Sequence, residues 1–275
     1  MSKRKRAVFI AVWVALIVVT LVGALLVGGR ESEESIKTVM RDAVLHGANK
    51  VSLFGIKEVN PAYISSMVVC GVILVAAAVI RIFVIPRFKY VPGKFQMVLE
   101  ELVEFFDNLA KTSSPHRNRF LGAYVFAAGV YIFVGTLFEL FGIQAPTTNG
   151  GTISLPAPLS DINAAIMLGC LSYLVILGGG IAGAKFKGVG RTLKEFSLPI
   201  SMSFRLFGAL LSGLLVTELV YYNISLSFVL PVFVGVMFTL LHALIQTYVL
   251  TMLTSMFYGE VSEPVLPKPK ATPHN

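Results

Sequence analysis

Residues 197–222 read SLPISMSFRLFGALLSGLLVTELVYY, and this stretch decides the class of fold. It is long and apolar enough to cross the hydrocarbon core of a bilayer, which takes about 20 residues of helix. Arg205 interrupts it. Even on lenient insertion scales, an arginine at such depth costs about 3 kcal/mol. We therefore expect a membrane helix whose arginine has a partner or a function.

Apolar runs of similar length recur along the whole chain, whose mean hydropathy is +0.78 and whose charged fraction is only 14%. The predicted spans are 7–29, 62–85, 120–141, 162–184, 197–222 and 228–257. The last two exceed the minimum length, so we expect them to tilt or bend. The predicted fold class is all-α, a polytopic membrane protein with about six transmembrane helices whose last two form a long tilted hairpin.

The net charge of +8 raises the question of nucleic-acid binding, but its distribution argues otherwise. Most of the 23 lysines and arginines fall between alternate apolar spans. Cytoplasmic loops of membrane proteins carry such an excess of basic residues. We therefore expect a lipid bilayer and no nucleic acid as partner, a cell (inner) membrane location, and both termini in the cytoplasm.

The chain divides into three parts by composition. Residues 1–61 contain an apolar run after MSKRKR and then a mixed, charged outer-surface segment. The run could be a cleaved signal peptide, but its length and the lack of a clear A-x-A site favour a retained anchor. Residues 62–260 form the predicted membrane domain, and 261–275 form a cytoplasmic tail.

An amphipathic helix is predicted for PGKFQMVLEELVEFFDNLAK, residues 92–111. Its apolar side chains recur at helical spacing while most of its acidic residues lie elsewhere, which is typical of an interfacial helix rather than a crossing. The apolar stripe consists of Phe95, Val98, Leu99, Leu102, Val103, Phe106 and Leu109.

Arg205 shares its helix face with small residues, because Gly208, Ala209 and Ser212 follow at helical spacing. Another helix could approach that face closely. A guanidinium keeps its proton at any relevant pH, so it can repeatedly attract a carboxylate and hold it ionised. The alternative is an arginine near the helix end that snorkels to the surface.

Gln246 in the final span is the second polar residue of interest. Counted from a turn near Leu226, Arg205 and Gln246 lie at almost equal distances along their helices, so a hairpin places them at matching depth. The alternative is an interhelical hydrogen bond that only holds the hairpin together.

SLPISMSFRLFGALLSG and ALIQTYVLTMLTSMFYGE resemble the last two helices of ATP synthase subunit a, with LVEFFDNL and PLSDINAAIMLG extending the resemblance upstream. The resemblance implies an F-type ATP synthase stator subunit in which Arg205 faces the carboxylates of a rotor ring of c subunits between two ion half-channels. It also implies contact with peripheral-stalk b subunits and, indirectly, with the F1 sector. Catalysis would occur elsewhere, without a cofactor in this chain.

The sequence departs from the family pattern at Ala209, where asparagine is usual, and at Leu214, where an acidic residue is common. Glu218 lies one helical turn beyond Leu214 on a similar face, so it is a plausible substitute. The alternative for Glu218 is a side chain that faces lipid headgroups. We therefore expect the gate, formed by Arg205, to follow the family pattern. The outer half-channel should be lined differently from the family pattern, with Glu139 and Glu218 as its acidic residues.

Further candidates for ion translocation are Glu139, Asp161, Asn163 and His242. Carboxylates at membrane depth need water or partners, so Glu139, Asp161 and Glu218 together would indicate a hydrated outer path. For Asp161 the favoured interpretation is a helix N-cap. His242 lies one turn from Gln246 and could relay protons, or serve only in packing.

No phosphate-binding loop, nucleophile elbow or pair of metal ligands is found in the sequence, so we expect no nucleotide hydrolysis, cofactor or metal in this chain. A self-contained ion-coupled transporter or channel is the main alternative, although no internal repeat supports it. A structural scaffold is a third class. The sequence does not distinguish protons from sodium ions.

Overall fold

The computed structural model describes residues 3–27, 37, 50–53, 57–148, 152–222 and 230–264. The described chain is predominantly helical, because its long apolar runs must pair their backbone groups internally. The long helices are α1 (Lys3–Val27), α3 (Pro61–Val79), α4 (Lys94–Ser113), α5 (Arg119–Phe138), α6 (Ile162–Ala184), α8 (Ser197–Tyr222) and α9 (Leu230–Ser262).

Five of the described helices are long and apolar enough to cross a membrane. Their apolar spans are Pro61–Arg87, Arg119–Phe141, Ile162–Ala184, Ser197–Val216 and Gly235–Ser262. The predicted run 7–29 corresponds to α1, which is apolar over the shorter stretch Val8–Val19 among the described residues. The expected all-α polytopic membrane protein is therefore confirmed.

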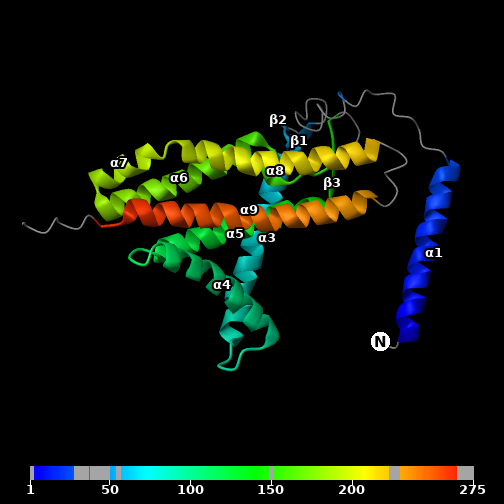
Figure 1. Cartoon of the computed structure of the whole chain (residues 1–275), viewed down its shortest axis with the longest axis horizontal. Helices are drawn as coiled ribbons and strands as arrows, with labels where there is room; N and C mark the ends of the chain where they lie inside the picture. The colour runs from blue at the N-terminus through cyan, green and yellow to red at the C-terminus, as the bar shows by residue number, and fades with distance from the viewer. Residues whose placement is uncertain are drawn as a thin grey trace, which may run out of the picture.

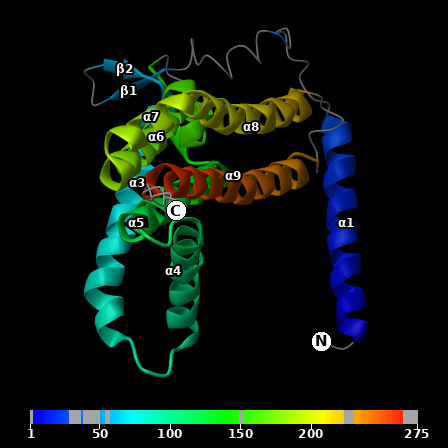
Figure 2. The ribbon, with the colours of Figure 1, turned by 60° about the vertical axis from the view of Figure 1, so that its left-hand side comes forward.

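The helices α5, α6, α8 and α9 run alongside one another as a bundle, while α3 runs crosswise to them (Figures 1 and 2). α1 stands apart in both views. α8 and α9 lie side by side as the predicted pair, and the turn between them is outside the described residues. If α3 spans the bilayer upright, this crosswise pair must be tilted. The largest fully buried core side chains are Leu121, Ile132, Ile176 and Leu206.

α3 ends gradually rather than abruptly. Its last apolar residues form a π-helical turn, η1 (Ile80–Val84), and then a 3-10 turn, η2 (Ile85–Arg87). Pro86 cannot donate a backbone hydrogen bond, so the regular helix stops before it. The chain then turns and returns through α4 to the start of α5 (Figure 2).

The predicted amphipathic helix is present as α4. Its second half packs against α5 through Phe106 and Ala110, which are both buried. Phe95 and Val98 in its first half are 60% and 64% exposed. The second half of the apolar stripe therefore packs against the bundle, while its first half stays exposed.

Two short hairpins are present, of which the first lies in the predicted outer-surface segment. β1 (Val51–Leu53) pairs with β2 (Lys57–Val59), and β3 (Gln144–Pro146) pairs with β4 (Thr152–Ser154). An antiparallel bridge between Val51 and Thr147 joins the hairpins. A 3-10 turn, η4 (Pro158–Ser160), then leads into α6 beside α3.

The remaining connection, from α6 to α8, is the short helix α7 (Phe186–Lys194). Lys185 links α6 to α7 with a positive φ of 52°, a conformation that side chains other than glycine rarely adopt. α6 also approaches α8 very closely, because a Cβ at Gly169 would collide with the Ser203 hydroxyl and the Pro199 carbonyl. This contact holds the start of α8 against α6, one turn before Arg205.

Candidate functional site

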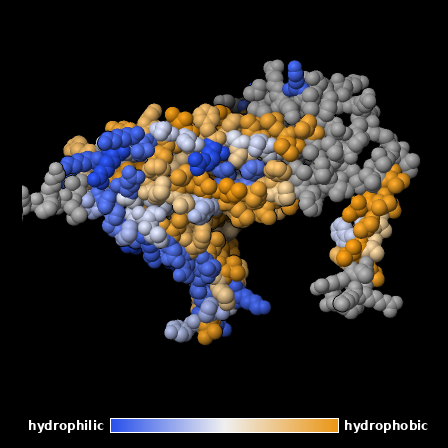
Figure 3. Space-filling model, viewed as in Figure 1, coloured by the Kyte–Doolittle hydropathy of each residue, from blue (hydrophilic) through white to orange (hydrophobic). Residues whose placement is uncertain are grey.

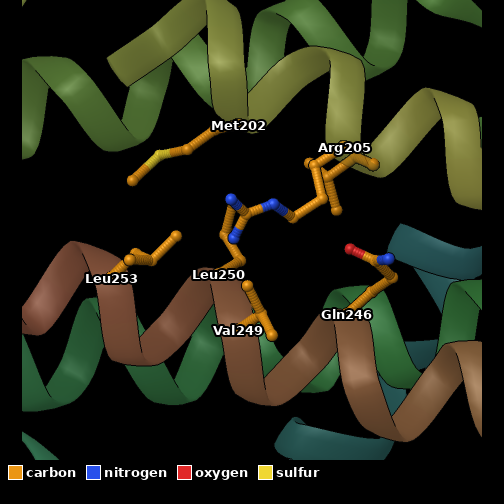
Figure 4. Close-up of a pocket in the computed structure, with 7 residues that line it drawn as sticks. Met202, Arg205, Gln246, Val249, Leu250 and Leu253 are labelled. Carbon is orange, nitrogen blue, oxygen red and sulfur yellow. The ribbon is translucent and has the colours of Figure 1, made fainter.

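Arg205 lies on α8, which runs without a break from Ser197 to Tyr222 although Pro199 is its third residue. A proline in the first turn costs no helical hydrogen bond. The Arg205 side chain is exposed and extends toward α9 (Figure 4). It borders a shallow hollow between α8 and α9, which is lined by Met202, Arg205, Leu206, Gln246, Val249, Leu250 and Leu253.

Gln246 lies across this hollow on α9 and is only 6% exposed. Its amide points toward α8 (Figure 4). Arg205 and Gln246 thus lie at the same level of the helix pair. This is the level predicted from their nearly equal sequence distances to the turn near Leu226. The other lining residues are apolar and offer Arg205 no polar partner.

Within the described part of the chain, no hydrogen bond or ion pair engages the Arg205 guanidinium. Gly208, one turn further on α8, is exposed, and a Cβ there would meet nothing within 4 Å. Ser212 is exposed as well, and its hydroxyl donates to the Ala209 carbonyl at 2.8 Å. The face that carries Arg205 therefore presents a fixed positive charge beside exposed small side chains.

Asp161 and Asn163 lie together at the start of α6. Asp161 is the N-cap residue, and its Oδ1 accepts hydrogen bonds from the Asn163 backbone N–H at 2.8 Å and from the Asn163 amide at 3.1 Å. Its second oxygen, Oδ2, accepts from Asn60 Nδ2 at 2.9 Å. Both carboxylate oxygens therefore hold structure at this end of the bundle.

Asn60 is the site residue that the sequence analysis missed. It caps α3 by accepting the Ala62 backbone N–H at 3.0 Å while its amide donates to Asp161. One signal was available, since asparagine followed by Pro61 is a typical helix start. Its partner on α6 was not predictable, because the two residues are 101 positions apart.

The other candidate residues lie on the elements around the hairpin. Glu139 is half-buried in the 3-10 turn η3 (Glu139–Phe141), which ends α5 and packs beside α9. The His242 imidazole covers Gly213 of α8, where a Cβ would lie 3.5 Å from Nδ1. Glu218 belongs to α8, but its side chain lies outside the described residues, so the predicted convergence of three carboxylates stays a prediction.

The fold and this site define a multi-pass membrane protein with an exposed arginine on a closely packed pair of apolar helices. The sequence matches the family described as ATP synthase A chain over residues 64–259, and the chain belongs to this family. ATP synthase subunit a of Histophilus somni (strain 129Pt) is 25% identical over 197 residues, which cover 61% of this chain and 73% of that protein.

Family membership defines the general role of the chain. It is a membrane component of the ATP synthase complex that belongs to the stator of the F0 sector and is not the catalytic part. The matched range contains Arg205, Gln246 and every candidate residue predicted from the sequence, but not Asn60.

Proposed function

We propose that this chain conducts ions to and from a rotor ring of c subunits, with Arg205 as the fixed charge that separates an outer from a cytoplasmic half-channel. The observation that carries the proposal is the exposed Arg205 guanidinium beside buried Gln246 in an otherwise apolar hollow between α8 and α9. Ion flow past this point drives rotation, and the rotation drives ATP synthesis elsewhere in the complex.

A carboxylate supplied by the rotor is the partner that Arg205 requires. The guanidinium stays protonated at every relevant pH, so each passing carboxylate is attracted to it and held ionised. An arginine in an apolar setting costs about 3 kcal/mol without such a partner. Gln246 keeps a hydrogen-bonding amide at the same level, which can orient the carboxylate without competing for its charge.

The surface around Arg205 suits a closely passing helix. Gly208 and Ser212 extend the exposed face of α8 with small side chains. Small residues allow helix backbones to approach one another in membranes. A rotor helix could therefore bring its carboxylate within reach of Arg205 and then move on.

The outer half-channel is assigned to the end of the bundle that carries Glu139, Glu218 and the Asp161–Asn163 pair. Glu139 and Glu218 supply the ionisable groups, while Asp161 and Asn163 shape the entrance through the α6 cap. His242 lies between α8 and α9 on the way to Gln246, and an imidazole can pass protons near neutral pH. The transported ion is a proton or a sodium ion.

Arg205→Ala in the assembled complex tests the central claim. We expect ATP-driven ion pumping and ATP synthesis in membrane vesicles to be lost, while Arg119→Ala, which removes an exposed arginine at the start of α5, leaves both intact. Equal amounts of assembled complex in both variants would show that folding is not the cause. Coupled synthesis that survives Arg205→Ala would refute the role of the arginine.

Purification tests the partners and excludes a self-contained transporter. The chain should co-purify with a ring of c subunits and with peripheral-stalk b subunits from the cell (inner) membrane. Labelling of both termini should place them in the cytoplasm. Ion transport by the isolated chain in liposomes would contradict the proposal and favour a transporter or channel.

A further inference from the structure

The short helix α7 has three distinct faces, of which the first is packed inside the chain. Gly188 and Thr192 are buried against the end of α6, where a Cβ at Gly180 would collide with both. The Thr192 hydroxyl donates to the Gly188 carbonyl at 3.0 Å, and the Tyr173 hydroxyl donates to the Thr192 carbonyl at 3.0 Å. These contacts fix the rotation of α7 about its own axis.

The second face of α7 is apolar and uncovered. Phe186 is 94% exposed and Leu193 is 59% exposed, although both are large hydrophobic side chains. Phe196, just past the end of α7, and Ile200 on α8 are exposed as well, at 62% and 50%. Because α7 follows directly on the membrane span Ile162–Ala184, this face lies at a boundary of the membrane.

The third face is basic. Lys187, Arg191 and Lys194 follow one another at helical spacing, and Lys185 precedes them in the turn. Arg191 donates from Nη1 to the Glu263 carbonyl at 3.0 Å and so fastens the end of α9. Lys187 and Lys194 are exposed and form no ion pair within the described residues. Figure 3 shows hydrophilic residues gathered over α7 at this end of the molecule.

From these faces we propose that α7 is a binding site for anionic phospholipid, with Phe186 and Leu193 among the acyl chains and Lys187 and Lys194 on the headgroup phosphates. A helix whose apolar and basic faces adjoin lies in the plane of a membrane interface. An acidic protein surface would match the lysines but would leave exposed Phe186 without an apolar partner. Lipid supplies both kinds of contact at the required depth.

The proposed lipid site has a role distinct from ion conduction, because α7 connects three helices of the bundle. α7 connects α6 to α8, the helix that carries Arg205, and Arg191 ties it to the end of α9. A bound lipid therefore holds the ends of both helices that border the gate.

Quenching of a tryptophan by brominated lipid tests the proposal in the full chain. Trp13 is the single tryptophan, so Trp13→Phe with Phe186→Trp places the only reporter on the apolar face of α7. The chain is reconstituted in phosphatidylcholine vesicles in which a minority component, either phosphatidylglycerol or phosphatidylcholine, is dibrominated. Leu193→Trp on the same face replaces the reporter if the first variant does not insert.

We expect brominated phosphatidylglycerol to quench this tryptophan more strongly than brominated phosphatidylcholine at the same fraction. Lys187→Gln with Lys194→Gln should reduce the preference by about five-fold for each lysine, because each contributes separately to anionic-lipid attraction. Lys89→Gln with Lys94→Gln removes equal charge from the α3–α4 turn and the start of α4, and it should preserve the preference.

Equal quenching by the two lipids would overturn the proposal. The proposal would also be overturned if the Lys89 and Lys94 variant lowered the preference for phosphatidylglycerol as much as the Lys187 and Lys194 variant does. The attraction would then depend only on net charge. Absence of quenching by either lipid would show that the Phe186 position lies away from the acyl chains and would equally refute a lipid site.

Discussion

Asp161 offers the sharpest test of how this structure is held together, because each of its carboxylate oxygens has an assigned partner. Asp161→Ala removes the N-cap bond to Asn163, worth about 1 kcal/mol. It also removes the bond from Asn60, for which hydrogen bonds to charged groups suggest about 2 kcal/mol. The expected loss is about 3 kcal/mol, which corresponds to a fall in Tm of roughly 6–12 °C for a domain of this size.

Asp161→Asn is the matched variant, because asparagine also caps helices well. Its carboxamide oxygen can still accept the Asn163 N–H, but its amide group cannot accept from the Asn60 amide. We therefore expect Asp161→Asn to melt between the wild type and Asp161→Ala. Coupled ATP synthesis in vesicles should largely survive in Asp161→Asn, since the carboxylate is assigned to holding the entrance and not to carrying ions.

Thermal unfolding of purified protein in detergent measures the first effect, and a double-mutant cycle with Asn60→Ala isolates the bond between the two helices. The summed losses of the two single variants should exceed the loss of the double variant by about 2 kcal/mol, the energy of the bond that both remove. Additive losses would refute the Asn60–Asp161 contact. Loss of ATP synthesis in a fully stable Asp161→Asn would instead assign the carboxylate to ion relay.

Gly169→Val should destabilise the chain by about 1–3 kcal/mol, because its side chain would collide with α8, whereas Gly178→Val on the same helix faces open space and should melt like the wild type. Equal melting of the two would contradict the close α6–α8 contact. Tyr131→Phe removes a hydroxyl bond between α5 and α3 and should lower stability by about 1 kcal/mol in the same assay. His116→Ala removes the 2.9 Å contact with Ser262 and should speed proteolysis at the end of α9; an unchanged cleavage rate would argue against that anchor.

The proximity of Arg205 and Gln246 was predictable because the two residues belong to neighbouring helices of one pair. An arginine in an apolar run is conspicuous, and the helical rise converts sequence distance into depth, so Gln246 could be paired with Arg205. The contact between Asn60 and Asp161 was not predictable, because no local pattern relates residues that meet only after α3 and α6 pack side by side.

The short strands were missed for a related reason. β1 to β4 have three residues each, too few for an alternating pattern to be recognised, and the bridge between Val51 and Thr147 joins segments that are far apart in the sequence. The amphipathic stripe of α4 was read correctly as one helical face. Only the bundle determines that Phe106 is buried while Phe95 is exposed.

The sequence by itself determined the membrane class, the helical segments and the pairing of Arg205 with Gln246, because hydrophobic length, charge and helical spacing are local properties of the chain. The tertiary structure decided which faces meet. It fixed the crosswise course of α3, the shared cap at Asp161 and the three faces of α7, since these depend on close contacts between helices distant in sequence.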